Sequence, residues 1–164
     1  MTAGSAITGW LCVMRILLLA TGVGAAVAVD AQTQGSADTR DTAAAVAAAT
    51  TEGNKWLAAL DAGRYAETWA DAATVFKEGA AQGDWIAQLT NIHETLGKAV
   101  IRKLESADYS RTLRGAPTGD YVTIIYLTQF ERAQIALETL ALTKEPDGHW
   151  RVAGYNIGRA PDSK

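Results

Sequence analysis

Apolar side chains recur at helical spacing in the N-terminal half of the chain. An alanine-rich stretch over 42–51 leads to Trp56, Leu57 and Leu60, and Gly63 follows at a position where helices commonly end. Alanine favours helix but has little surface to bury. The pattern therefore predicts a helix that frays at its start and packs at its end.

Two further helices are predicted from apolar stripes whose members stand three or four residues apart. The first stripe, which ends before Gly79, consists of Tyr65, Trp69, Ala73 and Phe76. The second lies between a candidate N-cap, Asp84, and Gly97, and consists of Trp85, Leu89, Ile92 and Leu96. We interpret the aromatic residues of both stripes as core, which gives about three helices.

Beyond Gly97 the pattern becomes that of β-strands. Segments 100–113, 121–130, 135–143 and 150–157 are rich in β-branched and aromatic residues or alternate apolar with polar positions. Turn sequences separate them, Gly115-Ala-Pro-Thr-Gly119 and Glu145-Pro-Asp-Gly148. Helices followed by strands indicate an α+β fold, with the helices covering one face of a four-stranded antiparallel meander. The expected shape is similar to the NTF2-like and cystatin-like folds.

The N-terminus has the features of a secretory signal peptide. Residues 16–29 carry no charge and follow Arg15, but they are too few for a bilayer span, which needs about 20 residues. Small residues at the −3 and −1 positions favour a cut after Ala31, and a cut after Ala28 is the alternative. We therefore expect a signal peptide over 1–31 and a periplasmic or secreted protein, with an uncleaved membrane anchor as the other interpretation.

The domain boundaries follow from this leader. Met14 is a natural start for such a peptide, so residues 1–13 are a possible extension, and Cys12 precedes the apolar core and does not mark a lipoprotein site. Residues 32–41 are polar without periodicity and predict a flexible tether. A single α+β domain is expected over 42–159, with a short tail over 160–164.

Composition excludes several classes of function. The chain has 164 residues, a net charge of −3, one cysteine and two histidines. One ordinary domain fits this length, and neither a disulfide scaffold nor a Cys- or His-rich metal site fits the composition. The acidic balance argues against a nucleic-acid partner. Glycine-rich phosphate loops, HExxH, CxxC and nucleophile-elbow motifs are absent from the sequence, so we expect neither cofactor nor metal and lean against an enzyme.

Glu138 is the most informative polar residue. It interrupts the apolar run 135–142 and, with period two, lies on the face opposite Ile135. If the Ile135 face meets the helices, Glu138 is solvated or salt-bridged, which is the interpretation we favour. If the sheet curves so that both of its faces are partly covered, Glu138 is a buried carboxylate with a raised pKa, suited to acid–base chemistry. Tyr126 and Tyr65 are then the candidate partners in catalysis, and Asp61 and Tyr109 are further candidates for the same pocket.

Other charged and titratable residues give weaker indications. His149 opens the last strand and is expected to be solvated, whereas His93 borders an apolar stripe, where it is half-exposed or able to respond to pH. A basic cluster on and after the first strand is a solvated strand face or a site for an anionic partner; it consists of Arg102, Lys103, Arg111 and Arg114.

Several landmarks occur together in a recognisable order. They are WLAALDAGRY (56–65), Trp85, GAPTGDYV (115–122), Glu138-Thr139 and DGHWRVAGYNI (147–157). Over residues near 52 to 159 the chain resembles the uncharacterised bacterial domain-of-unknown-function family number four-zero-one-nine. The resemblance implies an exported bacterial protein with no assigned activity, and it supplies no catalytic residues.

Three functions remain open on this basis. We favour a non-enzymatic exported module that binds a protein or small-molecule ligand in the cell envelope, with no membrane span after signal cleavage. One alternative is a small-ligand enzyme that uses a carboxylate and a tyrosine as an acid–base pair between helices and sheet. The second alternative is a structural envelope domain that self-associates through an exposed sheet face. The sequence does not determine the oligomeric state.

Overall fold

The computed structural model describes residues 30–132 and 135–160, in which four helices precede four strands. The helices are α1 (Asp30–Asp61), α2 (Tyr65–Ala70), α3 (Thr74–Gly79) and α4 (Gln82–Leu96). The strands are β1 (Ala99–Ser110), β2 (Tyr121–Phe130), β3 (Ala136–Lys144) and β4 (Trp150–Arg159), and they form one antiparallel sheet in that order. The predicted α+β class and meander sheet are confirmed. The likeness to NTF2-like or cystatin-like folds stays a prediction.

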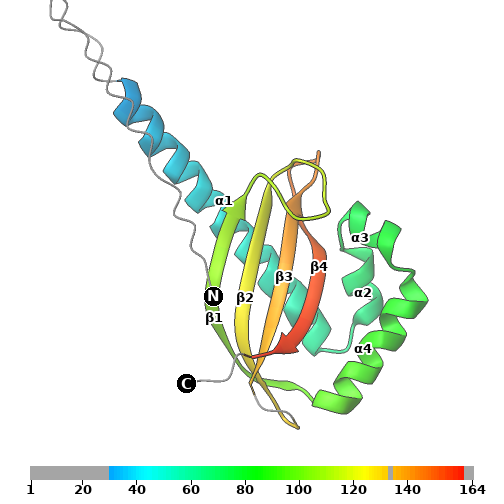
Figure 1. The fold of residues 1–164 in the computed structure, drawn as a ribbon. Coiled ribbons are helices and arrows are strands. Elements are labelled where there is room, and N and C mark those ends of the chain that lie inside the picture. The colour runs from blue at the N-terminus through cyan, green and yellow to red at the C-terminus, as the bar shows by residue number, and fades with distance from the viewer. Residues whose placement is uncertain (1–29, 133–134, 161–164) are drawn as a thin grey trace, which may run out of the picture.

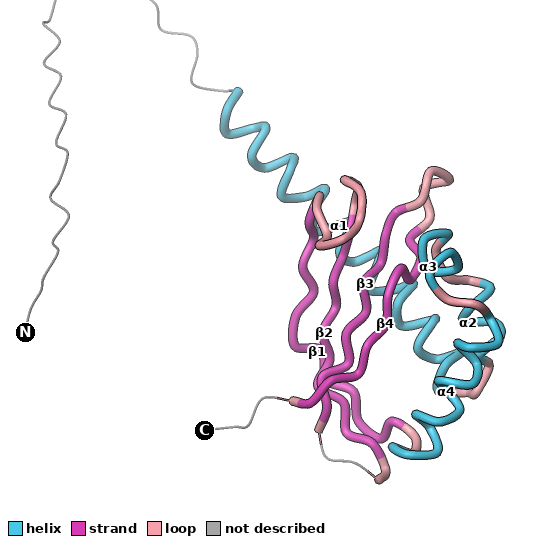
Figure 2. Tube along the Cα trace, turned by 45° about the vertical axis from the view of Figure 1, so that its right-hand side comes forward, coloured by secondary structure: helices cyan, strands magenta, loops and turns pink. Residues whose placement is uncertain are grey.

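The helices lie on one side of the sheet, which we call its inner face. Helix α1 crosses all four strands there, and α2, α3 and α4 continue beside β4 (Figures 1 and 2). Among the described residues no helix covers the opposite, outer face. Alternation along β2 and β3 sends every second side chain into the core. The largest fully buried apolar side chains are Leu57, Leu60, Leu89, Ile124, Leu140 and Leu142.

A glycine lets α1 approach the sheet closely. A Cβ atom added to Gly53 would lie 3.3 Å from Ile124 Cδ1 and 3.5 Å from side-chain carbons of Leu140 and Leu142. Without that Cβ the helix backbone packs directly on β2 and β3. In the following turns of α1, Trp56 packs on Tyr155 of β4 and Asp61 reaches Arg102 of β1.

The predicted second helix is two short helices in the structure. Residues 71–73 interrupt it, and Ala73 adopts an extended conformation with φ −61° and ψ 156°. The Ala73 N–H donates a 2.9 Å hydrogen bond to the Val152 carbonyl of β4. A continuous helix would lose this bond to the sheet edge and displace the buried Ala72 and Ala73 side chains. The single helix predicted over 65–76 is therefore wrong, and the structure has four helices where about three were expected.

Two helix starts also differ from the predictions. Helix α1 begins at Asp30 and runs through 32–41, so the predicted tether has helical backbone, which extends beyond the sheet (Figure 1). The alanine-rich stretch that follows explains this, since it favours propagation of helix toward the N-terminus. Helix α4 begins at Gln82, so Asp84 lies in its first turn and is not the N-cap.

The remaining boundary predictions fall partly outside the described residues. Almost all of the predicted signal peptide over 1–31 and residues 161–164 of the predicted tail lie outside the described residues. Within the part of the chain that is described, no helix combines the length and hydropathy needed to cross a bilayer.

The two edge strands of the sheet, β1 and β4, do not present regular rows of unpaired backbone groups. Pairing between β1 and β2 shifts register between Ala99 and Ile101 and again between Leu104 and Ser106. At the opposite edge of the sheet, the Val152 carbonyl of β4 already accepts a hydrogen bond from the Ala73 N–H.

Candidate functional site

Glu138 points toward the helices. The buried side chains of Leu140 and Leu142 share its face of β3, whereas Ile135, just before the strand, is 54% exposed. The Glu138 side chain itself is 0% exposed. The solvent-facing orientation that the sequence favoured is therefore wrong, although the salt bridge that this interpretation also allowed is present.

The Glu138 carboxylate accepts four hydrogen bonds. Its Oε2 atom accepts from Arg102 Nε at 2.6 Å and from Thr128 Oγ1 at 2.7 Å. Its Oε1 atom accepts from Tyr155 OH at 2.7 Å and from Arg102 Nη2 at 3.1 Å. Since an ionised carboxylate has about four lone-pair sites, the contacts within the protein use all of them.

Arg102 joins this carboxylate to a second one. It donates from Nη1 and Nη2 to the two Asp61 carboxylate oxygens at 2.8 and 3.0 Å. The Arg102 side chain is 17% exposed, and Asp61, at the end of α1, is 35% exposed. The guanidinium thus forms a fork on each of two carboxylates and ties α1 to β1 and β3.

The electrostatics of this cluster follow from burial and the shared guanidinium. Burial alone would lower the pKa of Arg102, but the hydrogen bonds to Asp61 and Glu138 outweigh it and raise that pKa. Burial, followed by the negative charge of Glu138, raises the pKa of Tyr155. Tyr155 therefore stays protonated and acts as a hydrogen-bond donor to Glu138.

His93 lies beside the same cluster. Burial lowers the pKa of His93, the negative charges of Asp61 and Glu138 act in the opposite direction, and Lys98 lowers it further. The imidazole ring meets the Tyr65 ring edge to face at 5.3 Å between centroids. The prediction of a half-exposed His93 on the border of an apolar stripe agrees with this position, since the residue is partly buried.

The tyrosines singled out in the sequence do not line one pocket with Glu138. Tyr126 pairs with Glu138 across β2 and β3, but its hydroxyl donates to Asn54 Oδ1 at 2.6 Å. Tyr65 packs on His93, and Tyr109 donates to Asp120 near the far end of the sheet. Asp61 is the one member of the predicted set whose side chain reaches the Glu138 cluster, through Arg102.

Sequence reasoning missed Thr128 and Tyr155 as partners of Glu138. Both occupy inner-face positions, Thr128 opposite Ala136 and Tyr155 opposite Leu140, which places each one diagonally from Glu138. A polar residue at an inward position of a neighbouring strand is the signal that would have found them, once the register was known.

The predicted basic cluster is dispersed. Arg102 points inward, opposite the buried Thr128, while the next residue, Lys103, is exposed and opposite Leu127 on the outer face. Arg111 lies 3.8 Å from Asp120, and Arg114 is exposed in the loop before β2. His149 is exposed, as expected.

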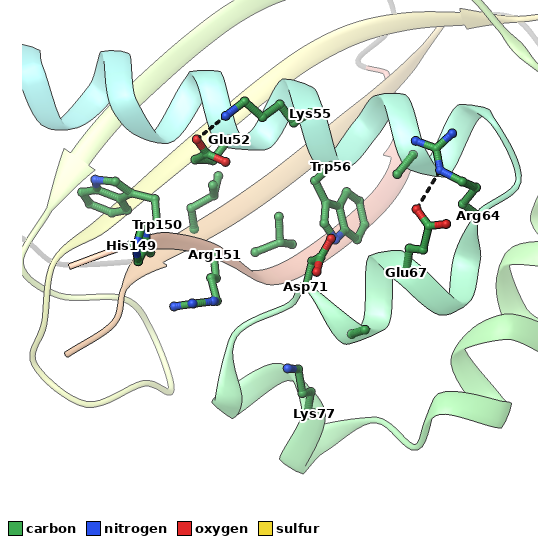
Figure 3. Close-up of a pocket in the computed structure, with 14 residues that line it drawn as sticks. Glu52, Lys55, Trp56, Arg64, Glu67, Asp71, Lys77, His149, Trp150 and Arg151 are labelled. Carbon is green, nitrogen blue, oxygen red and sulfur yellow. Dashed lines mark hydrogen bonds and ion pairs between the residues drawn. The ribbon is translucent and has the colours of Figure 1, made fainter. Parts of the chain in front are cut away.

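The described surface contains a groove between the helices and β4, which we call the α1–β4 groove. Its volume is about 520 Å³, and α1, α2, α3 and the start of β4 contribute its walls (Figure 3). The apolar lining includes Trp56, Ala59, Ala70, Leu142, Trp150 and Val152. The charged lining includes Lys55, Arg64, Lys77 and Arg151 together with Glu52, Glu67 and Asp71.

Four charged groups of the groove form two surface ion pairs, and Arg151 pairs instead with Glu145 and Asp147. Glu52 binds Lys55 at 2.7 Å, and Arg64 binds Glu67 at 2.7 Å, both with largely exposed side chains. Figure 3 shows these pairs at separate places along the groove, with Lys77 on the facing helix. The described residues contain no group of three or more His, Cys, Asp or Glu placed to hold a metal ion.

Comparison with known protein families identifies a match. The sequence model of a family described as "Protein of unknown function (DUF4019)" matches residues 52–155. No curated protein matches the chain. The matched range begins within α1 and ends within β4, so it contains the Glu138 cluster and every residue that lines the α1–β4 groove.

Proposed function

We propose a function for this chain, which belongs to the DUF4019 family of proteins of unknown function. The chain is an exported, non-enzymatic domain that binds an extended peptide in the α1–β4 groove. The observation that carries the proposal is the composition of that groove. Charged side chains of both signs surround a narrow floor, to which Trp56 and Trp150 contribute only their exposed edges because both are otherwise buried. Ligand sites commonly combine an apolar lining with a few polar groups that fix orientation.

The charged pairs in the groove are suited to exchange with a ligand. Exposed ion pairs contribute about 0–1 kcal/mol each to stability, so opening one to bind a ligand costs little. The lining has four Lys or Arg residues against three Asp or Glu, in a chain whose net charge is −3. Arg151 is already paired with Glu145 and Asp147, whereas the Lys77 ammonium lies over the Trp69 ring at 5.8 Å and has no ion pair among the described residues. Lys77 is therefore the cation of the lining that is most readily available to an acidic side chain of a peptide.

The Glu138 cluster favours binding over acid–base catalysis. A general base needs a free lone pair within reach of the substrate proton. Arg102, Thr128 and Tyr155 occupy all the acceptor sites of the fully buried Glu138 carboxylate. Catalysis by Glu138 would require this cluster to be dismantled first. We therefore assign Glu138 a structural role, and the groove the functional one.

Panning a library of random linear peptides against the purified protein tests the groove. We expect enrichment of peptides with acidic residues and loss of their binding in Lys77→Glu, which reverses one charge of the lining. Lys98→Glu makes the same charge change at an exposed position outside the groove and should leave binding unchanged. Failure to enrich any sequence, or equal binding by Lys77→Glu, would contradict the proposal.

Export is the second part of the proposal. It rests on the uncharged stretch 16–29 behind Arg15 and on the small residues before Gln32. A cut after Ala31 removes only the first two residues of α1. Mass spectrometry of the protein from periplasm and medium should find Gln32 as the first residue. Recovery of the chain with residues 16–29 still attached would contradict cleavage.

A further inference from the structure

The outer face of the sheet is largely uncharged. On β2 and β3 it presents Thr123, Ile125, Leu127, Leu137, Thr139 and Ala141, all partly exposed. On β4 the register adds Gly154, Asn156 and Gly158. Charges on this face are concentrated on β1, where Lys103 and Asp108 are exposed. An uncharged surface of this kind, with Ile125, Leu127 and Leu137 near its centre and charges at one border, is suited to contact with another protein surface.

Strand register arranges these side chains in three rows across the sheet. The first, bulky row contains Lys103, Leu127, Leu137 and Gly158. The middle row contains Ser106, Ile125, Thr139 and Asn156. The third, small row contains Asp108, Thr123, Ala141 and Gly154. Along β2 and β3, the bulky and the small row each lie two residues from the middle row.

These rows complement each other under a two-fold rotation. The two-fold axis lies between the two sheets and runs parallel to the middle row. A second copy that packs face to face on the first copy then places its small row over the bulky row of the first copy. Leu127 and Leu137 then meet Thr123 and Ala141, and the ammonium of Lys103 meets the carboxylate of Asp108. Ile125 meets the same residue of the second copy. A two-fold interface requires such self-complementarity.

We propose that the outer face binds a second copy of this chain, with β1 opposite β1 and the Lys103 and Asp108 side chains paired twice across the interface. The surface area is adequate for this. Four strands about 4.8 Å apart and ten residues long at about 3.3 Å per residue give the whole outer face roughly 600 Å², of which the three rows form about the central half. Stable interfaces begin near 600 Å² per partner, so we expect a dimer of modest affinity. The inference is independent of the α1–β4 groove, which lies on the other side of the sheet.

A charge-swap experiment tests the specific pairing. Sedimentation velocity over a concentration series gives the dimer dissociation constant of the purified protein. Lys103→Asp places two pairs of carboxylates in contact, and Asp108→Lys two pairs of ammonium groups, so each should raise that constant about tenfold or more. The double variant Lys103→Asp/Asp108→Lys restores opposite charges and should return to within about threefold of the original protein. Lys144→Asp, outside the three rows, is the matched control and should change nothing.

An apolar position provides the second arm. Leu127→Arg should raise the dissociation constant about a hundredfold, because it brings an unpaired charge into the interface. Leu127 is partly exposed, so the circular dichroism spectrum should not change. A strictly monomeric original protein at high concentration would overturn the proposal. So would a dimer that survives Leu127→Arg, or a double swap that is as weak as the single variants.

Discussion

Arg102 on β1 and Glu138 on β3 are joined by two hydrogen bonds of 2.6 and 3.1 Å, although strand β2 lies between them. Thr128 on β2 lies under this bridge and donates to the same Glu138 oxygen. Asp61 extends the bridge to the end of α1. One guanidinium thus fixes the position of the principal helix over three strands.

Removal of the guanidinium should destabilise the protein strongly. In Arg102→Met the carboxylate of Glu138 stays buried but loses its cation, which costs about 3–5 kcal/mol for comparable buried pairs. Urea denaturation of both proteins measures this change in the free energy of unfolding. Arg114→Met removes an exposed guanidinium and should change stability by less than about 0.5 kcal/mol. A loss for Arg102→Met as small as that of the control would contradict the structural role of the cluster.

The two inner-face tyrosines should differ in their contribution to stability. Tyr155→Phe deletes a donor to a buried charged carboxylate, a loss of about 1.5–3 kcal/mol. Tyr126→Phe deletes a donor to the amide of Asn54, an exposed residue, a loss of about 0.5–1.5 kcal/mol. Urea denaturation of the two variants compares them directly. A larger loss in Tyr126→Phe would show that the Glu138 contact is less important than the geometry indicates.

His93 should make stability depend on pH. Burial lowers the pKa of His93 in the folded protein below its ordinary value of 6.5, so the unfolded chain binds the proton more readily. The contribution of His93 is fully present above about pH 6.5 and is lost as the pH falls through the folded pKa. Unfolding measured from about pH 8 to 5 should therefore show a shallower loss of stability in His93→Gln than in the original protein. Equal slopes in the two proteins would refute the prediction.

Gly97 should tolerate no side chain. It ends α4 with φ +75°, and an added Cβ would lie 2.8 Å from the Cβ of Glu131. Gly97→Ala combines this clash with a left-handed backbone and should cost about 1–3 kcal/mol. Gly79→Ala is the control, since no atom lies within 4 Å of its added Cβ and its φ is not positive. Thermal unfolding should show a clearly lower midpoint for Gly97→Ala only.

The sequence predicted elements whose signals are local. The β-branched and aromatic run over 121–130 coincides with β2, and the glycine of Glu145-Pro-Asp-Gly148 has the positive φ that its hairpin needs. The break at Ala73 was not predictable in this way. It depends on the carbonyl of Val152, which is distant in sequence and becomes a neighbour only after folding.

In the candidate site, too, the local pattern was predictable from the sequence and the contacts between distant residues were not. Period two placed Glu138 and Ile135 on opposite faces but gave no means to decide which face the helices cover. Ile135 is the more apolar residue of the two, yet it is exposed just before β3, while Glu138 is buried. Its partners come from β1, β2, β4 and α1, so only the register and the position of α1 bring the cluster together.

The irregular edges of the sheet limit how copies of the chain can join. An open sheet has unpaired backbone groups on both outer strands, and a regular edge can template the addition of further strands into a fibre. The Val152 carbonyl of β4 is already bound to Ala73, and β1 has two register shifts and interleaved charges. Neither edge is therefore a flat, continuous template. Contact through the outer face would end at two copies, whereas growth through the edges would have no natural end.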